Sequence, residues 1–265
     1  MGCPLTVVIL AKNEEARIEK CLKSVYGWAE EIILIDDESQ DRTVEIASKY
    51  TEKIFKRMMD LEGKQRNFGI SLAKFDWVIM VDSDEILTQE LKQEIEEVLS
   101  RKEDDYIAAY SISKVHYLGH HQLKYGGWSR PSIKLGNRKY VHCSEAEHDL
   151  IHGGIIIERG YTTGVLKNPY IHYSSSSVED FIRKDNRYST LEAMKWYISG
   201  RKMGLGRALW RTVDRFIRRF ISKQGYKDGF YGFIAAFMSG AHELLTYAKY
   251  REIKEHKTYH TPKDF

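Results

Sequence analysis

Cysteine is scarce in this sequence, which has three among 265 residues, at positions 3, 21 and 143. They are widely spaced and odd in number, a pattern that suits a reducing compartment better than a disulfide framework. Their spacing also excludes a zinc site built from cysteine pairs. We therefore expect a cytoplasmic protein without structural disulfides.

Long apolar runs are missing as well. The uncharged stretch from Gly229 to His242, which is rich in Phe and Ala, is shorter than the ~20 residues that a spanning helix needs. Near the N-terminus, the apolar run from Leu5 to Ala11 has no basic leader and continues into Lys12-Asn-Glu-Glu15, unlike a signal peptide. We expect no membrane-spanning segment.

Two further absences narrow the class of protein. No Gly-x-Gly-x-x-Gly motif follows an apolar run, which disfavours a dinucleotide-binding dehydrogenase. The net charge of +3 is too small to indicate a nucleic-acid partner, and none is expected. With 42% hydrophobic residues and no internal repeat, the chain suits one large α/β domain with additions, or two small domains.

The N-terminal part alternates apolar runs with acidic loops and helical patterns. Strands are expected at residues 5–11 and 31–35, with a helix at 14–25 that Asn13 would cap. A strand, a polar loop and a helix, repeated, predict a parallel sheet whose ligands bind beyond the carboxyl ends of the strands. This arrangement would gather Asn13, Asp37 and Asp84 around one cleft.

The stretch from Asp76 to Glu85 carries the clearest chemistry. Val78 to Val81 reads as a buried strand, and it ends in Asp82, Ser83 and Asp84. Side chains alternate along a strand, so the two aspartates would share a face, and a divalent metal holding a diphosphate would relieve their repulsion. The alternative is a pair of solvated turn residues, with Glu85 favouring the start of the next helix.

The middle of the chain predicts more helices and short strands. Helices are expected at residues 63–73, 89–100 and 178–199, and strand-like segments at 106–112, 155–157 and 170–173. Exposed loops between Tyr106 and Tyr140 would shape a substrate pocket.

Residues 201–223 form a basic amphipathic segment, with Asp214 as the single acidic residue. Apolar residues from Leu209 to Ile221 interleave with arginines at helical spacing. Such a helix is typical of elements that lie on anionic membranes. It could equally pack on the domain with its basic face in water.

Four motifs in the first 100 residues together resemble the family 2 glycosyltransferases. They are Val7–Glu14 (VVILAKNE), Ile35–Thr43 (IDDESQDRT), Lys64–Asn67 (KQRN) and Val81–Glu85 (VDSDE). Residues 166–173, 178–188 and 225–229 are similar to the branch that adds β-glucose to lipopolysaccharide core. The resemblance implies a GT-A fold, an α/β structure with a mostly parallel sheet flanked by helices and a C-terminal helical extension.

This resemblance also implies a division of the chain and roles for single residues. Residues 1–175 would form the transferase domain, with the nucleotide sugar bound by 1–100 and the acceptor by 101–175. Residues 176–265 would form a helical region, for which membrane association is one interpretation. The residues implied to bind the nucleotide sugar are Ala11, Asn13, Glu14, Asp36, Asp37, Arg66 and Asp82. Within this set, Asp37 would accept the uracil N–H, Asp36 would orient the loop and Asp82 would hold the ribose. Asp84 would bind Mg²⁺ or Mn²⁺, helped by His172, although a histidine ending a strand can also be purely structural.

An inverting transfer needs a general base for the acceptor hydroxyl. The branch commonly has His-Glu at this point, where this sequence has Ala146-Glu147. Glu147 is our candidate, with Asp149 and Glu145 in reserve, and the alternative is a solvated acidic loop.

Together these features predict an inverting, metal-dependent glycosyltransferase that moves a sugar, expected to be glucose, from a UDP-sugar. The acceptor would be lipopolysaccharide core or another lipid-linked saccharide, and the enzyme would be peripheral on the cytoplasmic face of the inner membrane. A non-catalytic nucleotide-sugar-binding or assembly subunit is the alternative that the missing histidine allows. A sugar nucleotidyltransferase is disfavoured because no glycine-rich loop follows the first strand.

Overall fold

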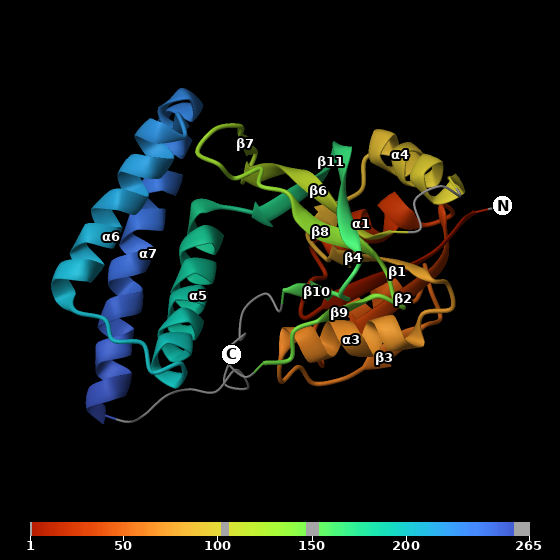
Figure 1. The fold of residues 1–265 in the computed structure, drawn as a ribbon, viewed down its shortest axis with the longest axis horizontal. Helices are drawn as coiled ribbons and strands as arrows, with labels where there is room; N and C mark the ends of the chain where they lie inside the picture. Colours follow the sequence, from red (N-terminus) through yellow and green to blue (C-terminus); the bar gives the residue numbers. More distant parts are fainter. Residues whose placement is uncertain (1, 102–105, 147–153, 257–265) are drawn as a thin grey trace. The chain divides into compact units, whose positions relative to one another are not determined.

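The protein is described here by a computed structural model that covers residues 2–101, 106–146 and 154–256 (Figure 1). The chain forms two compact units. The first, which we call the sheet unit, comprises Met1–Lys114, Pro131–Glu145 and Gly153–His172. The second, the helical unit, comprises Val115–Arg130, Ala146–His152 and Tyr173–Phe265.

The sheet unit is organised around a mixed sheet with strand order β3-β2-β1-β4-β8-β6-β11-β5. Its strands are β1 (Cys3–Ala11), β2 (Ala29–Asp36), β3 (Ile54–Lys56), β4 (Trp77–Asp82), β5 (Glu85–Ile86), β6 (Ile107–Leu118), β8 (Ser132–Asn137) and β11 (Thr162–Ser175). The pairs among β1 to β4 are parallel, whereas β8 pairs antiparallel with both β4 and β6. A separate hairpin pairs β9 (Val141–Cys143) with β10 (Ile155–Ile157).

Helices cover both faces of the parallel half because its strands are apolar on both sides. One face packs on α1 (Ile18–Val25), α2 (Thr43–Ala47) and α4 (Gln89–Ser100), and the other on α3 (Glu62–Leu72) (Figure 1). The alternation of β1 divides its side chains accordingly: Val7 and Ile9 belong to the first core, and Val8 to the second.

The strand register brings the polar loops to one edge, as the sequence predicts. Ala11 at the end of β1 pairs with Asp36 at the end of β2, and Leu10 pairs with Asp82 at the end of β4. The loops that follow these three strands therefore begin side by side.

The expected cap at Asn13 is wrong. Helix α1 begins at Ile18, and Asn13 has a left-handed backbone with φ of +54°. The side chain of Asn13 accepts a hydrogen bond from the Gln40 amide at 2.8 Å instead of capping a helix. The helix starts late because the neighbouring loop captures this segment's backbone.

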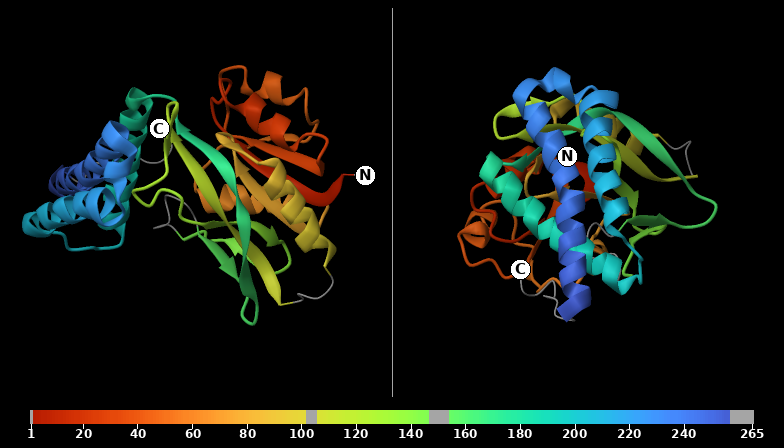
Figure 2. Two further views of the ribbon diagram at one scale, coloured as in Figure 1. Left: turned by 90° about the horizontal axis from the view of Figure 1, so that it is seen from above. Right: turned by 90° about the vertical axis from the view of Figure 1, so that its left-hand side faces the viewer.

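The helical unit contains α5 (Val178–Ile198), α6 (Leu205–Ile217), a π-helical turn (Arg218–Ser222), a 3₁₀ turn (Gly225–Asp228) and α7 (Gly229–His256). Its short strand β7 (His121–Leu123) pairs with the end of β6. Helix α7 lies between α5 and α6 (Figure 2). Within the part of the chain that the structure describes, no helix combines the length and the apolar character needed to cross a membrane.

Candidate functional site

The loops that follow β1 and β2 are tied together by their backbones and short side chains. Asn13 N donates to Ser39 Oγ at 2.9 Å, and Glu14 N donates to Thr43 Oγ1 at 2.7 Å. Asp37 N donates to the carbonyl of Ala11 at 2.8 Å. These bonds fix the relative positions of the predicted nucleotide-binding residues of both loops.

Asp36 and Asp37 are both buried, but they face different partners. Asp36 Oδ2 accepts from Ser39 N at 3.1 Å, which holds the loop that Asp36 is predicted to orient. Asp37 Oδ1 accepts from Met59 N at 2.7 Å, and its Oδ2 lies 3.2 Å from Lys12 Nζ. The carboxylate of Asp37 is therefore held by a backbone amide on one side and a lysine on the other.

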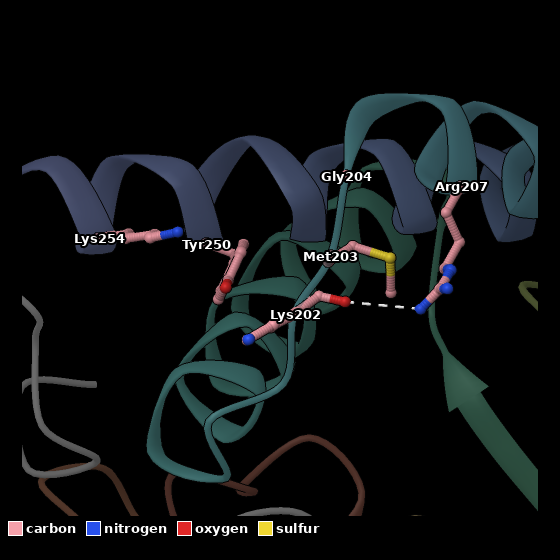
Figure 3. A pocket seen from close by; sticks show the side chains of 6 residues that line it. All are labelled: Lys202, Met203, Gly204, Arg207, Tyr250 and Lys254. Atoms are coloured by element: carbon pink, nitrogen blue, oxygen red, sulfur yellow. Dashed lines mark hydrogen bonds between the residues drawn. The ribbon is translucent and has the colours of Figure 1, made fainter.

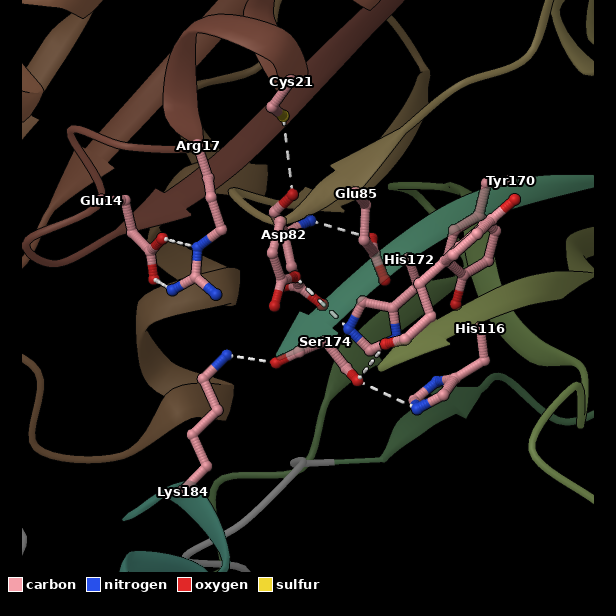
Figure 4. Close-up of polar contacts among 12 residues, drawn as sticks. Glu14, Arg17, Cys21, Asp82, Glu85, His116, Tyr170, His172, Ser174 and Lys184 are labelled. Atoms are coloured by element: carbon pink, nitrogen blue, oxygen red, sulfur yellow. Dashed lines mark hydrogen bonds and ion pairs between the residues drawn. The ribbon is translucent and has the colours of Figure 1, made fainter. Parts of the chain in front are cut away.

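Glu14 forms a two-pronged ion pair with Arg17 (Figure 4). Arg17 Nε lies 2.7 Å from Glu14 Oε2, and Nη2 lies 2.8 Å from Oε1. Fork-to-fork pairs of this kind fix both side chains in orientation. A role for Glu14 was predicted from the sequence, whereas its partner Arg17, three residues later, was not.

Asp82 at the end of β4 is held between two cationic side chains. Arg66 Nη2 lies 2.7 Å from Oδ1, and Lys134 Nζ lies 2.8 Å from Oδ2. Desolvation by the surrounding protein would raise the pKa of Asp82, but the charges of Arg66 and Lys134 outweigh it and hold this pKa well below its usual range. Asp82 is therefore an anion whose charge the protein itself compensates.

Glu85 turns into the protein beside this group. Its side chain is buried, and Oε2 accepts from Asp82 N at 2.9 Å (Figure 4). The same oxygen accepts from Lys134 Nζ at 2.7 Å. Burial raises the pKa of Glu85, and the charge of Lys134 offsets this effect only in part. The expectation that Glu85 merely favours the start of the next helix therefore misses its contacts with β4 and β8.

Asp84 lies in the turn between β4 and β5, together with Ser83. Burial alternates here as predicted, with Ser83 and Glu85 buried and Asp82 and Asp84 partly exposed. Antiparallel pairing of β5 with β11 places His172 opposite Glu85. His172 Nε2 then lies 3.4 Å from Asp84 Oδ1, so the two predicted metal ligands are adjacent.

Within the described part of the chain, these two residues do not belong to a larger cluster of metal-binding side chains. Among the described residues, no group of three or more His, Cys, Asp or Glu side chains is arranged to hold a metal ion. A cation at Asp84 and His172 would therefore need further oxygen ligands from the substrate or from water.

Helix α3 anchors both Asp82 and the segment that follows β9. Asn67, next to Arg66, donates from Nδ2 to the Cys143 carbonyl at 3.0 Å and to Glu145 Oε1 at 2.6 Å, and its Oδ1 accepts from Cys143 N at 2.7 Å. Gly63 packs so closely that an added Cβ would lie 1.8 Å from the Ser144 carbonyl oxygen.

The candidates for the general base fall at the end of this segment. Glu145 is described and accepts the hydrogen bond from Asn67. Glu147 and Asp149 lie outside the described residues.

Lys134 is the main residue of this site that the sequence reasoning missed. It lies in β8 between Ile133 and Leu135, is buried, and contacts both Asp82 and Glu85. Its Nζ also lies 5.4 Å from the ring centroid of Tyr170, whose pKa burial raises. A lysine flanked by apolar residues in a strand pattern was the available signal, because a lysine rarely becomes buried without an anionic partner.

The helical unit has a hollow of its own, of about 430 Å³ (Figure 3). It is lined by Lys202, Met203, Gly204, Arg207, Tyr250 and Lys254. Met203 and Tyr250 are buried, and the Tyr250 hydroxyl donates to the Arg201 carbonyl at 2.8 Å. The hollow thus has an apolar floor and a cationic rim.

Comparisons with known proteins agree with this arrangement. The chain is 29% identical over 255 residues to an uncharacterized glycosyltransferase of Rickettsia typhi, covering 94% of this chain and 87% of that protein. It is 26% identical over 255 residues to the lipopolysaccharide core biosynthesis glycosyltransferase LpsC of Rhizobium meliloti, covering 93% and 91%.

A solved structure of similar fold is the mannosyltransferase PcManGT of Pyrobaculum calidifontis, in complex with GDP-Man and Mn²⁺. It has a TM-score of 0.55 and 10% identity and covers 95% of this chain and 88% of that one. The predicted GT-A fold is confirmed, with a sheet whose pairs among β1 to β4 are parallel and in which β8 joins β4 and β6 in antiparallel fashion. The family model Glycosyl transferase family 2 matches residues 6–162. This chain is therefore a glycosyltransferase and belongs to family 2.

Proposed function

We propose that this glycosyltransferase moves a sugar, glucose in the first instance, from a UDP-sugar to a lipopolysaccharide-core or other lipid-linked saccharide, with inversion at the anomeric carbon. The observation that carries the proposal is the acidic turn after β4. There, Asp84 faces His172 at 3.4 Å, next to an Asp82 whose charge is already balanced by Arg66 and Lys134. The similarity to LpsC over 93% of the chain supports the class of acceptor.

The donor site in this proposal combines the two interlocked loops with the acidic turn. Asp37 accepts the uracil N–H, while Ala11, Asn13 and Glu14 line the nucleotide pocket. Asp36 keeps the second loop in place through Ser39. Asp82 binds the ribose, and Arg66 lies beside it to contact the nucleotide.

A divalent cation, Mg²⁺ or Mn²⁺, fits the pair of Asp84 and His172. Two ligand atoms that each lie about 2.1 Å from an octahedral cation are about 3 Å apart, close to the observed 3.4 Å. The carboxylate oxygen of Asp84 is a ligand of the type that both Mg²⁺ and Mn²⁺ prefer. When bound, the cation would neutralise charge on the leaving diphosphate.

Glu147 is our proposed general base, with Asp149 and Glu145 in reserve. A carboxylate in this position takes the proton of the acceptor hydroxyl as its oxygen attacks the anomeric carbon. Glu145 is the weakest of the three, because its Oε1 already accepts a hydrogen bond from Asn67.

We further propose that the enzyme works as a peripheral protein at the cytoplasmic face of the inner membrane. A lipid-linked acceptor keeps its saccharide close to the bilayer surface. The exposed cations of the segment 201–223, Lys202 and Arg207 among them, support attraction to anionic lipid.

Calorimetric binding of UDP, with GDP and CDP as controls and with or without Mn²⁺, tests the donor site. We expect uridine-selective binding that Mn²⁺ strengthens in the wild type and leaves unchanged in Asp84→Asn. Asp76→Asn, an exposed aspartate on the same chain, is the matched control. Equal binding of all three nucleotides, or a metal response that survives Asp84→Asn, would contradict the proposed site.

A further inference from the structure

Helix α6 buries charged side chains and exposes apolar ones, the reverse of an ordinary surface helix. Its arginines Arg211 and Arg215 point towards α7, where both bind Glu243, whose side chain is 3% exposed. Arg211 Nε lies 2.7 Å from Glu243 Oε2, and Nη2 lies 3.1 Å from Oε1. A surface helix normally buries its apolar stripe and exposes its charges.

The outward face of α6 and the following turn is apolar instead. Leu205, Leu209, Val213, Ile217 and Ile221 recur every four residues, and each is between 46% and 56% exposed. Trp210 on the same helix is 64% exposed. A step of four residues advances about 40° around an α-helix, so this row winds slowly, and its central members Leu209, Val213 and Ile217 share one face. Large apolar side chains gathered in this way mark an interaction surface, unlike single exposed residues.

Helix α7 extends this apolar face. Its exposed apolar residues are Phe230, Phe233, Phe237, Leu244 and Leu245. The ring of Phe233 packs edge-on against Phe216 and Phe220 of the α6 segment, at centroid distances of 5.9 and 5.6 Å. The stripes of the two helices are therefore joined at these rings. We call the two stripes together the outer face.

Both interpretations of the sequence, a membrane-surface helix and a helix with its basic face in water, expected the arginines to be exposed, and the structure places several of them inward. Arg219 donates to the Gly126 carbonyl at 3.0 Å, and its guanidinium carbon lies 3.8 Å from the centre of the Trp128 ring. Burial lowers the pKa of Arg219 to about 10. With Arg211 and Arg215 paired to Glu243, these three cations are structural, whereas Arg218 is exposed and pairs with Asp214.

Positive charge nevertheless borders the outer face at its Leu205 end. Lys202, Arg207 and Lys254 rim the hollow shown in Figure 3, and Leu205 lines the adjoining part of the same depression. Cations beside an apolar surface match the layered chemistry of an anionic bilayer, where phosphates lie above acyl chains.

We infer that the outer face of α6 and α7 lies in the interfacial layer of an anionic membrane, with Trp210 and the leucine and isoleucine side chains among the acyl chains. The rim of Lys202, Arg207 and Lys254 then contacts lipid phosphates. This inference names the docking surface of the peripheral enzyme and rests on the proposed function for its choice of a lipid-linked acceptor.

A lipid surface is the occupant that this face fits best. The exposed cations at the rim of this face are Lys202, Arg207 and Lys254, so two copies packed face to face with these rims together would bring like charges into contact. Anionic lipid instead offers charge of the opposite sign along the whole rim, together with an apolar layer beneath it.

Trp210 provides a direct measurement. The full chain is mixed with vesicles of phosphatidylcholine alone, or with added phosphatidylglycerol, and Trp fluorescence is recorded with and without brominated acyl chains. We expect a blue shift and bromine quenching that require the anionic lipid, and that disappear in Trp210→Phe while sedimentation with the vesicles persists.

A triple variant tests the apolar contact, and a matched double variant controls for it. Leu209→Ser/Val213→Ser/Ile217→Ser should lower vesicle partitioning by about tenfold or more, since each change removes apolar area from the bilayer. Tyr26→Ser/Val165→Ser, which changes exposed apolar residues of the sheet unit, should partition like the wild type. Lys202→Gln/Arg207→Gln/Lys254→Gln should weaken binding only to anionic vesicles.

The membrane-docking surface and the proposed donor site can be tested independently of each other. UDP binding measured without vesicles should be unchanged in all of these variants. Wild-type vesicle partitioning by the triple serine variant, or a concentration-dependent dimer that this variant abolishes without any vesicle binding, would overturn the docking surface and leave the donor site standing. A wild-type enzyme that binds vesicles but shows no uridine selectivity would overturn the donor site and leave the docking surface standing.

Discussion

Lys134 Nζ lies 2.8 Å from Asp82 Oδ2, and the same ammonium lies 2.7 Å from Glu85 Oε2. One buried lysine thus connects the carboxylates on both sides of the Ser83-Asp84 turn. Because the turn is short, the direction in which Asp84 points depends on how its two ends are held. Lys134 is therefore a positioning residue for Asp84 in the proposed site.

Replacing Lys134 with Met should leave two carboxylates without their shared cation. We expect a loss of about 3–5 kcal/mol in the free energy of unfolding, typical of removing one partner of a buried ion pair. Urea unfolding at neutral pH measures it. Lys139→Met, which removes an exposed lysine paired with Asp76, should cost below about 1 kcal/mol. Similar losses in both variants would show that the bridge is not structural.

Gly63→Ala should disturb the contact between α3 and the segment after β9. The added Cβ would lie 1.8 Å from the Ser144 carbonyl oxygen, so backbone must move. We expect a cost of about 1–3 kcal/mol. Gly206→Ala is the control, because nothing lies within 4 Å of its added Cβ and alanine favours helix α6. The midpoint of thermal unfolding should fall in Gly63→Ala and rise in Gly206→Ala. A shift of both midpoints in the same direction would argue against the clash at Gly63.

Glu243 should contribute to stability at neutral pH and lose that contribution in acid. Burial would raise the pKa of Glu243, but hydrogen bonds from Arg211 and Arg215 outweigh it and leave this pKa lowered. A carboxylate with a lowered folded-state pKa stabilises the fold above the unfolded value of about 4.3, and loses this effect as the pH falls through the folded value.

Glu243→Gln should therefore be destabilised by about 1–3 kcal/mol at pH 7. Its difference from the wild type should shrink as the pH falls below about 4.3, as followed by urea unfolding across a pH series. Glu252→Gln, an exposed change on the same helix, should show no comparable loss at pH 7. A constant difference for Glu243→Gln at every pH would mean that the ion pairs do not stabilise the fold.

Glu147→Gln tests the assignment of the general base. We expect kcat to fall by about 10²–10⁴ while UDP binding is retained, because the change removes a proton acceptor and leaves the donor site intact. Glu145→Gln and Asp149→Asn should keep most of the activity. If one of these two variants loses activity and Glu147→Gln does not, the general base is the carboxylate whose replacement abolished activity.

Much of the fold follows from local patterns. Helix α4 has the predicted bounds, because its apolar spacing is regular and Thr88 Oγ1 accepts from Leu91 N at its start. The buried strands of the parallel half were equally predictable from their apolar runs. The start of α1 was not, because Glu14 N donates to Thr43 Oγ1 at the start of α2, 29 residues away.

The candidate site shows the same limit. Asp82, Asp84 and Arg66 were identifiable from motifs, whereas Lys134 depends on β8 pairing with β4, which no local pattern specifies. In the same way, the alternation of α6 predicts two faces but cannot say which is buried. Glu243, distant in sequence, decides that the arginines point inward. The assignment of residues 101–175 to the acceptor stays a prediction.

Arg66 and Asn67, neighbours in α3, reach Asp82 on one side and Cys143 and Glu145 on the other. Thermal motion of this helix must therefore displace the end of β4 and residues 143–145 together. The distance between these two segments should therefore vary less than the position of either one, because both are bonded to the same helix. Weakening either bond would then increase the spread of distances between them without changing the average.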